Sequence, residues 1–349
     1  MLIDRRNALR QAAGVLACSV LPATRSEAAG KFSGRTLVFA SWGGVYQNAQ
    51  RQAFCVPFTR KTGAKIVQDG PVSAARLRVM LDSGSIDWDV VVGNPAILFS
   101  LGNRLEKVDT SIVDLSQVPP RFRWEHGVSC DAGAMVLAYS MDAFHNRKAP
   151  GEWQDLFDLK RYPGKRMLPG DPRFTLETAL LADGVPPHQL YPLDIGRALR
   201  KLDSIKDKTI FYQSYSQAQQ LIVDGVVTCG MMFSSRAFAC VKDGARVGVS
   251  WRGNLRDFTP IVVPAGGRNQ DMAWSLVNES LNPVNQAYLA NDQSISPTNF
   301  AALKLIRPEI MPWIPTSPKN LAIGVDVDGQ YWGTNYRAIN KRWQLWKLV

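Results

Sequence analysis

The N-terminal third of the chain alternates between short apolar runs and segments with a helical period of apolar positions. The apolar runs predict strands at 36–40, 65–67 and 88–92. The periodic segments predict helices over 45–62 and 74–83, which Gly63 and Gly84 close. Strands that alternate with helices indicate a parallel or mixed sheet with helices on both faces.

The same alternation returns later in the chain and indicates a second α/β unit. Three tryptophans in the last predicted helix, Trp332, Trp343 and Trp346, have the spacing of a packed helix face and are expected in the core. The elements expected after residue 130 are strands at 135–139, 210–212, 226–233 and 261–264, and helices at 175–183, 192–202, 215–223, 273–281, 283–291 and 330–349.

The first 29 residues have the pattern of an export signal. Arg5-Arg6 precedes an apolar run from Ala12 to Leu21, which is too short to span a membrane. The small residues of Ser26-Glu27-Ala28 then suit cleavage by a signal peptidase. The arginine pair predicts a twin-arginine signal over residues 1–29, with a general secretory signal as the alternative. Cys18 raises a lipid anchor as a second alternative. Either route predicts a protein outside the cytoplasm, in the periplasm.

Composition and charge narrow the class of function. The formal net charge is +11, but the basic residues are scattered along the sequence, without the basic stripe or stacking module of a nucleic-acid binder. None of the common nucleophile, phosphate-loop or zinc motifs occurs, and the histidines are isolated, so we expect no enzyme activity, no cofactor and no metal site. Of the cysteines beyond residue 29, only Cys229 and Cys240 are a pair worth testing for a disulfide.

Two loops at predicted strand ends are the first candidates for a binding site. Residues 41–46 follow the first strand and residues 93–96 follow the third. Ligands of open α/β sheets bind beyond the carboxyl ends of the strands. Trp42 and Tyr46 offer flat faces for an alkyl chain or a cation, and Gly43-Gly44 would let backbone N–H groups approach a ligand. A tight turn alone would also explain the glycines.

Several motifs in order along the chain resemble the spermidine/putrescine-type solute-binding proteins of ABC importers. The resemblance covers about residues 36–346, and no single motif carries it alone. It implies a type II periplasmic-binding-protein-like α/β fold, with two lobes of mixed sheet and helices joined by two crossovers. It also implies an inner-membrane permease and ATPase as partners of a monomer. The matching segments are 41–46, 53–63, 87–91, 138–144, 153–158, 160–166, 180–185, 283–287 and 297–299.

The resemblance also implies the lobes and the residues of a cleft between them. Lobe 1 would comprise 31–138 and 261–308, and lobe 2 would comprise 139–260 and 309–349. The cleft would hold the ligand and close upon it. The implied ligand-binding residues are Trp42, Gly43, Gly44, Tyr46, Asn94, Asp171, Gln217, Phe233, Arg236 and Thr259.

Departures from the family pattern leave two ligand classes open. Polyamine binders surround ammonium groups with carboxylates, because an uncompensated buried cation costs several kcal/mol. Phe174 and Thr259 stand where further acids are expected, and Arg236 adds a cation. The resemblance predicts a small amine or polyamine as ligand, whereas these departures favour a zwitterionic or anionic solute. An exported enzyme on the same fold is the third alternative.

Overall fold

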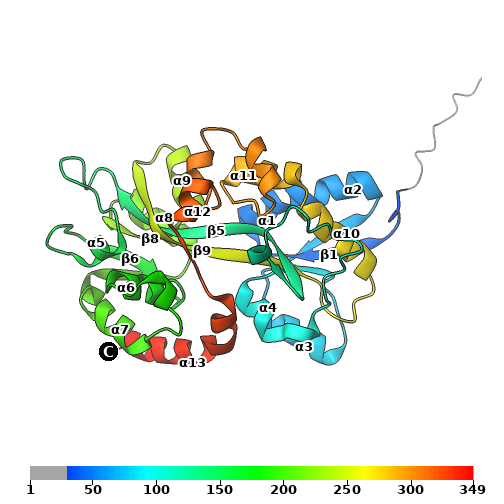
Figure 1. The fold of residues 1–349 in the computed structure, drawn as a ribbon, viewed down its shortest axis with the longest axis horizontal. Coiled ribbons are helices and arrows are strands. Elements are labelled where there is room, and N and C mark those ends of the chain that lie inside the picture. The colour runs from blue at the N-terminus through cyan, green and yellow to red at the C-terminus, as the bar shows by residue number, and fades with distance from the viewer. Residues whose placement is uncertain (1–29, 349) are drawn as a thin grey trace, which may run out of the picture.

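A mixed sheet of ten strands runs through the computed structural model, which describes residues 30–348 (Figure 1). The predicted signal segment 1–29 and Cys18 lie outside the described residues. The main path of the sheet is β2-β1-β3-β9-β5-β8-β6-β7, with β4 paired to β5 and β10 paired to β9. The strands are β1 (Thr36–Ala40), β2 (Lys65–Asp69), β3 (Val90–Val92), β4 (Arg123–Trp124), β5 (Gly127–Ser140), β6 (Arg166–Pro169), β7 (Thr209–Tyr212), β8 (Cys229–Phe233), β9 (Val247–Val262) and β10 (Val325–Asp326).

Strand direction divides this sheet into two parallel sets with an antiparallel pair between them. Strands β2, β1 and β3 are parallel, and so are β8, β6 and β7. The long strands β5 and β9 pair antiparallel with each other, and each also pairs antiparallel with one of the sets. The α/β class with a mixed sheet is therefore confirmed.

Helices cover both faces of the sheet, and their ends follow the local sequence. The side chain of Ser73 caps α3, and left-handed Gly63 and Gly84 end α2 and α3 as predicted. The predicted helix at 45–62 is continuous but contains a π-helical turn at Arg51–Cys55. The α-helices are α1 (Gly44–Gln50), α2 (Val56–Thr62), α3 (Ala74–Ser83), α4 (Pro95–Leu101), α5 (Trp153–Phe157), α6 (Thr175–Ala182), α7 (Ile195–Asp203), α8 (Tyr215–Val223), α9 (Ser234–Lys242), α10 (Gln270–Ser280), α11 (Pro283–Gln293), α12 (Pro318–Ala322) and α13 (Gly329–Leu348).

The strand predicted at 261–264 is wrong in extent. β9 covers Val247–Val262 and so begins fourteen residues earlier. The middle of β9 is polar, so apolar alternation does not predict it as a strand. There, Asn254 donates hydrogen bonds to the carbonyls of Trp251 and Asn320, and Arg256 pairs with Asp326. Hydrophobic alternation detects a strand only where one of its faces meets an apolar core.

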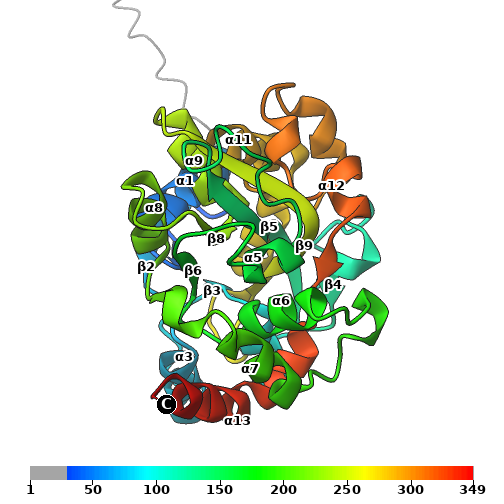
Figure 2. The ribbon, with the colours of Figure 1, turned by 90° about the vertical axis from the view of Figure 1, so that its left-hand side faces the viewer.

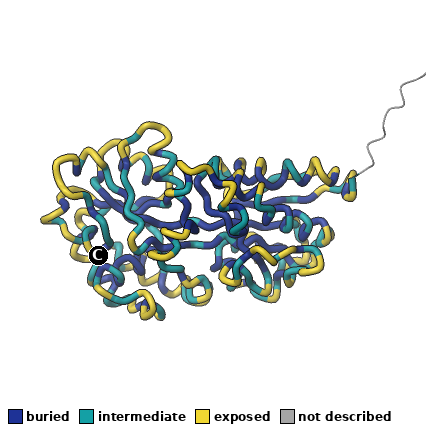
Figure 3. Tube along the Cα trace, turned by 45° about the horizontal axis from the view of Figure 1, so that its top comes forward, coloured by how far each residue is buried: buried dark blue, intermediate teal, exposed yellow. Residues whose placement is uncertain are grey.

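The two largest apolar cores lie in different halves of the sheet, and both long strands contribute residues to each of them. Buried backbone runs through the length of the molecule (Figure 3). On β5, Ala132 belongs to the first core and Met135 to the second; on β9, the corresponding residues are Phe258 and Leu255. Ala132 is in register with Phe258, and Met135 with Leu255. The change of core therefore occurs at the same level on both strands.

The C-terminal helix α13 spans the two halves of the molecule along one edge (Figures 1 and 2). Trp332 and Trp343 are fully buried in the second core, as predicted, whereas Trp346 is only partly buried against it. The first turns of α13 lie against α4, whose neighbours belong to the first half of the sheet. The contact is close enough that a Cβ at Gly333 would approach the Cβ of Phe99 to 2.7 Å.

We expect Gly333→Val to destabilise the protein by about 1–3 kcal/mol, because the added side chain overfills the contact with Phe99. Ala338→Val is the matched control, since Ala338 is exposed on the same helix and the change adds the same β-branched side chain. Urea unfolding followed by tryptophan fluorescence measures both variants. Equal stability of the two would contradict close packing between α13 and α4.

A buried carboxyl on α6 fixes α13 to the second core. Glu177 Oε1 accepts hydrogen bonds from Trp332 Nε1 at 2.6 Å and from the Tyr191 hydroxyl at 2.7 Å. Oε2 has no hydrogen-bond partner among the described residues. Burial raises the pKa of Glu177, although the two donors oppose the shift.

This raised pKa makes stability depend on pH in a predictable direction. A folded-state pKa above the unfolded value means that the stabilising contribution is complete below the unfolded pKa and is lost as pH rises through the folded pKa. Glu177→Gln keeps the acceptor for Trp332 and Tyr191 without the ionisation. We expect the Tm of the variant, relative to the wild type, to rise between about pH 4 and pH 8. A difference that is constant across this range would contradict an ionisable Glu177 in the core.

Candidate functional site

The carboxyl ends of the two parallel strand sets face one another across a cavity of about 470 Å³. Loops after β1 and β3 form one wall, loops after β6, β7 and β8 form the other, and the middle of β5 and β9 forms the floor. Ligands of α/β sheets bind at such strand ends. The lining residues are Trp42, Gly43, Val45, Tyr46, Gly93, Asn94, Asp131, Gly133, Arg173, Tyr215, Phe233, Ser235, Arg236, Ala239, Asp257, Phe258, Thr259, Gln293 and Ile295.

The first wall carries an exposed aromatic and an amide. Trp42 keeps 38% of its surface exposed, so its ring is open to a bound molecule. Asn94 caps α4 by accepting the Ile97 N–H at 2.9 Å, and its Nδ2 has no protein acceptor among the described residues. Gly43 has φ +81°, but its N–H already donates to Gln47 Oε1 at 2.8 Å. The predicted use of that N–H for a ligand is therefore not supported by the geometry.

A buried carboxylate, Asp131, lies at the floor of the cavity. The Tyr46 hydroxyl donates to Asp131 Oδ2 at 2.7 Å, and Gln50 Nε2 lies 3.5 Å from the same oxygen. Burial raises the pKa of Asp131, while hydrogen bonds from Tyr46 and Thr259 oppose the shift. Asp131 thus offers an acceptor that is already oriented toward the cavity.

An ion pair and two aromatic rings form the second wall. Arg173 Nη1 lies 3.0 Å from Asp257 Oδ2, and both side chains are largely buried. The rings of Tyr215 and Phe233 meet edge to face with centroids 4.9 Å apart. Burial raises the pKa of Tyr215 to about 12, so its hydroxyl is neutral and can donate at physiological pH.

Arg236 is the cation of this cavity that lacks a counter-charge. It lies in the first turn of α9, directly after the end of β8, and is half-buried. Among the described residues, no carboxylate forms a salt bridge with Arg236 and no acceptor forms a hydrogen bond with it. The lining therefore holds the carboxylates of Asp131 and Asp257 and the guanidinium groups of Arg173 and Arg236, which balance formally.

The structure brings seven of the ten predicted site residues to the cavity and places three elsewhere. Gly44 begins α1 and is exposed outside the lining. Asp171 accepts the Tyr336 hydroxyl at 2.6 Å and so faces α13. Gln217 accepts the backbone N–H of Gln213 at 2.8 Å at the start of α8. The seven that line the cavity are Trp42, Gly43, Tyr46, Asn94, Phe233, Arg236 and Thr259.

Five charged or aromatic residues of the cavity were not among the predicted site residues, and one of them is Phe258 on β9. Asp131 and Asp257 lie within strands, Arg173 precedes α6, and Tyr215 begins α8. The sequence did contain a signal for Asp131, because an acid within an apolar run is expected to be buried. A buried carboxylate requires hydrogen-bond or charge partners, which marks it as a candidate site residue. Its partners Tyr46 and Gln50 come from α1, about eighty residues earlier, and the sequence alone does not pair them.

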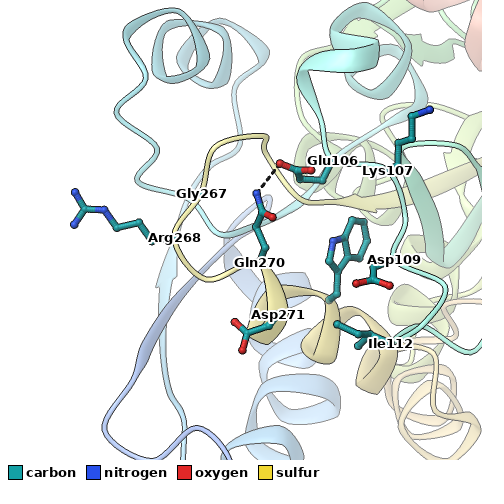
Figure 4. Close-up of a pocket in the computed structure, with 9 residues that line it drawn as sticks. Glu106, Lys107, Asp109, Ile112, Gly267, Arg268, Gln270 and Asp271 are labelled. Carbon is teal, nitrogen blue, oxygen red and sulfur yellow. Dashed lines mark hydrogen bonds between the residues drawn. The ribbon is translucent and has the colours of Figure 1, made fainter.

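A second hollow, of about 650 Å³, lies beside the start of α10 (Figure 4). Gln270 Nε2 donates to Glu106 Oε1 at 2.6 Å, and the lining residue Asp271 pairs with Arg35. Arg268 and Lys107 project away from the hollow in Figure 4. With its polar groups paired or pointing outward, this hollow lacks the converging groups of the first cavity.

The remaining expectations concern cysteines, metal ligands and membrane spans. Among the cysteines, Cys130 lies beside the cavity floor, with its Sγ 3.6 Å from Asp131 Oδ2. Cys55, Cys130, Cys229 and Cys240 are buried and unbonded, so the Cys229–Cys240 disulfide is not formed. Residues 30–348 contain no cluster of metal-ligating side chains. Within the same range, no helix combines the length and apolarity that crossing a bilayer requires.

Comparison with known proteins gives matches that extend over most of the chain. A family profile described as bacterial extracellular solute-binding protein matches residues 53–320. The γ-aminobutyric acid-binding protein of Pseudomonas aeruginosa is 30% identical over 91% of this chain and 93% of its own length. The spermidine/putrescine-binding periplasmic protein of Escherichia coli is 24% identical over 72% of this chain and 76% of its own. A solved structure of a GABA receptor is 34% identical, with a TM-score of 0.85 and coverage of 90% and 98%.

Proposed function

Because this chain belongs to the bacterial extracellular solute-binding protein family, its cavity is expected to hold a small solute. We propose that this solute is a small zwitterion of the γ-aminobutyrate class. Members of this family bind solutes for ABC transporters and are not enzymes. The ligand would carry an ammonium group and a carboxylate separated by a short alkyl chain. This proposal selects the zwitterionic alternative over the polyamine that the resemblance alone implied.

The unpaired Arg236 is the observation that carries this choice. A half-buried guanidinium without a counter-charge is stabilised when a ligand supplies a carboxylate. Asp131, with its donors Tyr46 and Gln50, would accept the ammonium group at the floor of the cavity. The rings of Trp42 and Phe233 would enclose the alkyl chain between the two charges.

Formal charge in the cavity argues against a polyamine. Arg173 already neutralises Asp257. The remaining charges, Arg236 and Asp131, do not pair with each other but are equal in number, so no carboxylate is in excess. Burying a dication here would leave uncompensated positive charge, which costs several kcal/mol. Relatives that bind γ-aminobutyrate at 30% and 34% identity support the zwitterion, whereas the polyamine-binding relative is 24% identical.

Two lobes that close on the ligand would follow from the two apolar cores. We place the change of lobe between Ala132 and Met135 on β5, and between Leu255 and Phe258 on β9. The resemblance to the family implies a change of lobe after residues 138 and 260 instead. Bending of these paired strands would bring Arg236 toward Trp42. A periplasmic monomer delivering its solute to an inner-membrane permease and ATPase is consistent with the family.

Three ligands that share a four-carbon chain test the proposal. Calorimetric titration should give micromolar or tighter binding of γ-aminobutyrate and no binding of putrescine or succinate at about millimolar concentration. γ-Aminobutyrate carries one charge of each sign, putrescine two positive charges and succinate two negative charges. Tight binding of putrescine without γ-aminobutyrate binding would restore the polyamine alternative. Tight binding of succinate alone would indicate an anion carrier.

A further inference from the structure

Basic residues that are scattered in the sequence gather on one face of the folded protein. The C-terminal helix α13 contains four cations and no carboxylate. Beside it lie α7 and the turn at Lys206–Lys208, where Trp346 Nε1 donates to Asp203 Oδ1 at 2.8 Å and Lys206 Nζ donates to the Trp346 carbonyl at 2.6 Å. Both views of the fold show α7 and α13 together at one edge (Figures 1 and 2). We call this surface the α7–α13 face.

Most cations of the α7–α13 face have no internal partner. Arg197 and Lys201 pair with Asp183, and Asp203 accepts the Trp346 indole. Asp194 caps α7 by accepting the Arg197 N–H, which leaves Asp207 as the other carboxylate of this segment. Within the described chain, no ion pair engages five cations of this face: Arg200, Lys208, Arg337, Lys341 and Arg342.

The face also exposes apolar surface in the middle of its charges. Leu345 follows Lys341 by one helical turn and keeps 58% of its surface exposed. The opposite side of α13 is occupied by Trp332 and Trp343 in the second core, so the helix is fixed in place and cannot bury Leu345 by rotating. At an anionic bilayer, basic residues pair with lipid phosphates and an exposed leucine between them can enter the headgroup region.

We propose that the α7–α13 face binds reversibly to a bilayer surface that carries anionic phospholipid headgroups. α13 lies along the outer edge of the molecule, where an extended surface can approach its exposed side (Figure 1). Arg337, Lys341 and Arg342 would contact lipid phosphates, and Leu345 would enter the headgroup region. Such adhesion would hold the protein near the membrane without a spanning helix. The cavity lies on other elements, so this inference is independent of the identity of the solute.

Vesicle binding tests the inference with two variants of equal charge loss. The protein should sediment with vesicles of phosphatidylcholine and phosphatidylglycerol at about 10 mM salt, and be released at about 0.5 M salt. Pure phosphatidylcholine vesicles should not bind it. The triple variant Arg337→Gln, Lys341→Gln, Arg342→Gln should lower the partition coefficient at least about tenfold. The control Arg51→Gln, Arg60→Gln, Lys65→Gln removes as much charge from exposed positions of α1–β2 and should change it less than about twofold.

Each alternative outcome decides against the proposal. Equal losses in both triple variants would mean that total charge, and not this face, drives adhesion. Failure of the wild type to bind anionic vesicles would exclude a lipid partner, and retention on the detergent-solubilised permease alone would assign the face to a protein instead.

Far-UV circular dichroism and Tm of each variant establish that the fold is intact. A Leu345→Ser variant should weaken vesicle binding a further few-fold if the leucine enters the interface.

Discussion

Arg236→Ala is expected to weaken binding of γ-aminobutyrate by about 2–4 kcal/mol, because the ligand carboxylate loses a charged hydrogen-bond partner inside a closed cavity. Arg236 is the guanidinium of the lining without a carboxylate partner among residues 30–348. Its removal therefore leaves no orphaned protein charge, and the loss should appear in affinity and not in stability. Calorimetric titration measures the first quantity, and thermal unfolding without ligand measures the second.

Two further variants separate the role of Arg236 from a general effect of charge. Arg246→Ala removes an exposed arginine that pairs with Asp142 far from the cavity, and it should bind the solute like the wild type. Arg236→Lys keeps the charge without the planar fork and should fall between the wild type and the alanine variant. An affinity of Arg236→Ala equal to that of the wild type would remove Arg236 from the site.

Arg173→Met is expected to lower the free energy of unfolding by about 3–5 kcal/mol, because it leaves the Asp257 carboxylate buried without its partner. The two side chains meet at 3.0 Å where α6 begins and where β9 crosses between the cores. Burial already raises the pKa of Asp257, and Arg173 opposes that shift. Without the arginine, the pKa of Asp257 should rise further, so the loss should shrink as pH falls.

The double variant Arg173→Met, Asp257→Asn provides the control, since it removes the orphaned charge together with the cation. It should regain most of the stability lost by the single variant, as measured by urea unfolding at neutral pH. A double variant as unstable as Arg173→Met would show that Arg173 acts through packing on Phe174 instead of through Asp257. The guanidinium lies 4.7 Å from that ring centroid.

The parts of the fold that the sequence predicts are those with a local cause. The strand at Thr36–Ala40 and the helix at Ala74–Ser83 agree with their predicted bounds because an apolar run, a serine cap and a glycine end are all local signals. Most of β9 was not predicted, because its polar residues Asn254 and Arg256 find partners in the chain around residues 320–326. Such partners are invisible to periodicity.

The residues of the candidate site also differ in whether a local sequence signal predicts them. Trp42 and Asn94 could be predicted because each directly follows a short apolar strand, where ligands of such sheets bind. Asp171 also follows a strand, β6, yet it faces Tyr336 of α13, whose position depends on the tertiary fold. Asp131 and Asp257 were missed because they lie in the two strands that cross between the cores. Only the register of β5 against β9 brings them to the cavity.

These crossing strands have a thermodynamic consequence. β5 and β9 supply side chains to both apolar cores and bond to each other along most of their length. Unfolding of either core would therefore disrupt strands that the other core needs, so we expect the two cores to unfold together. Calorimetry should accordingly record one endotherm whose van't Hoff and calorimetric enthalpies agree. Two independently folding domains joined by a linker would give two endotherms. The two halves of the protein would therefore denature as a unit.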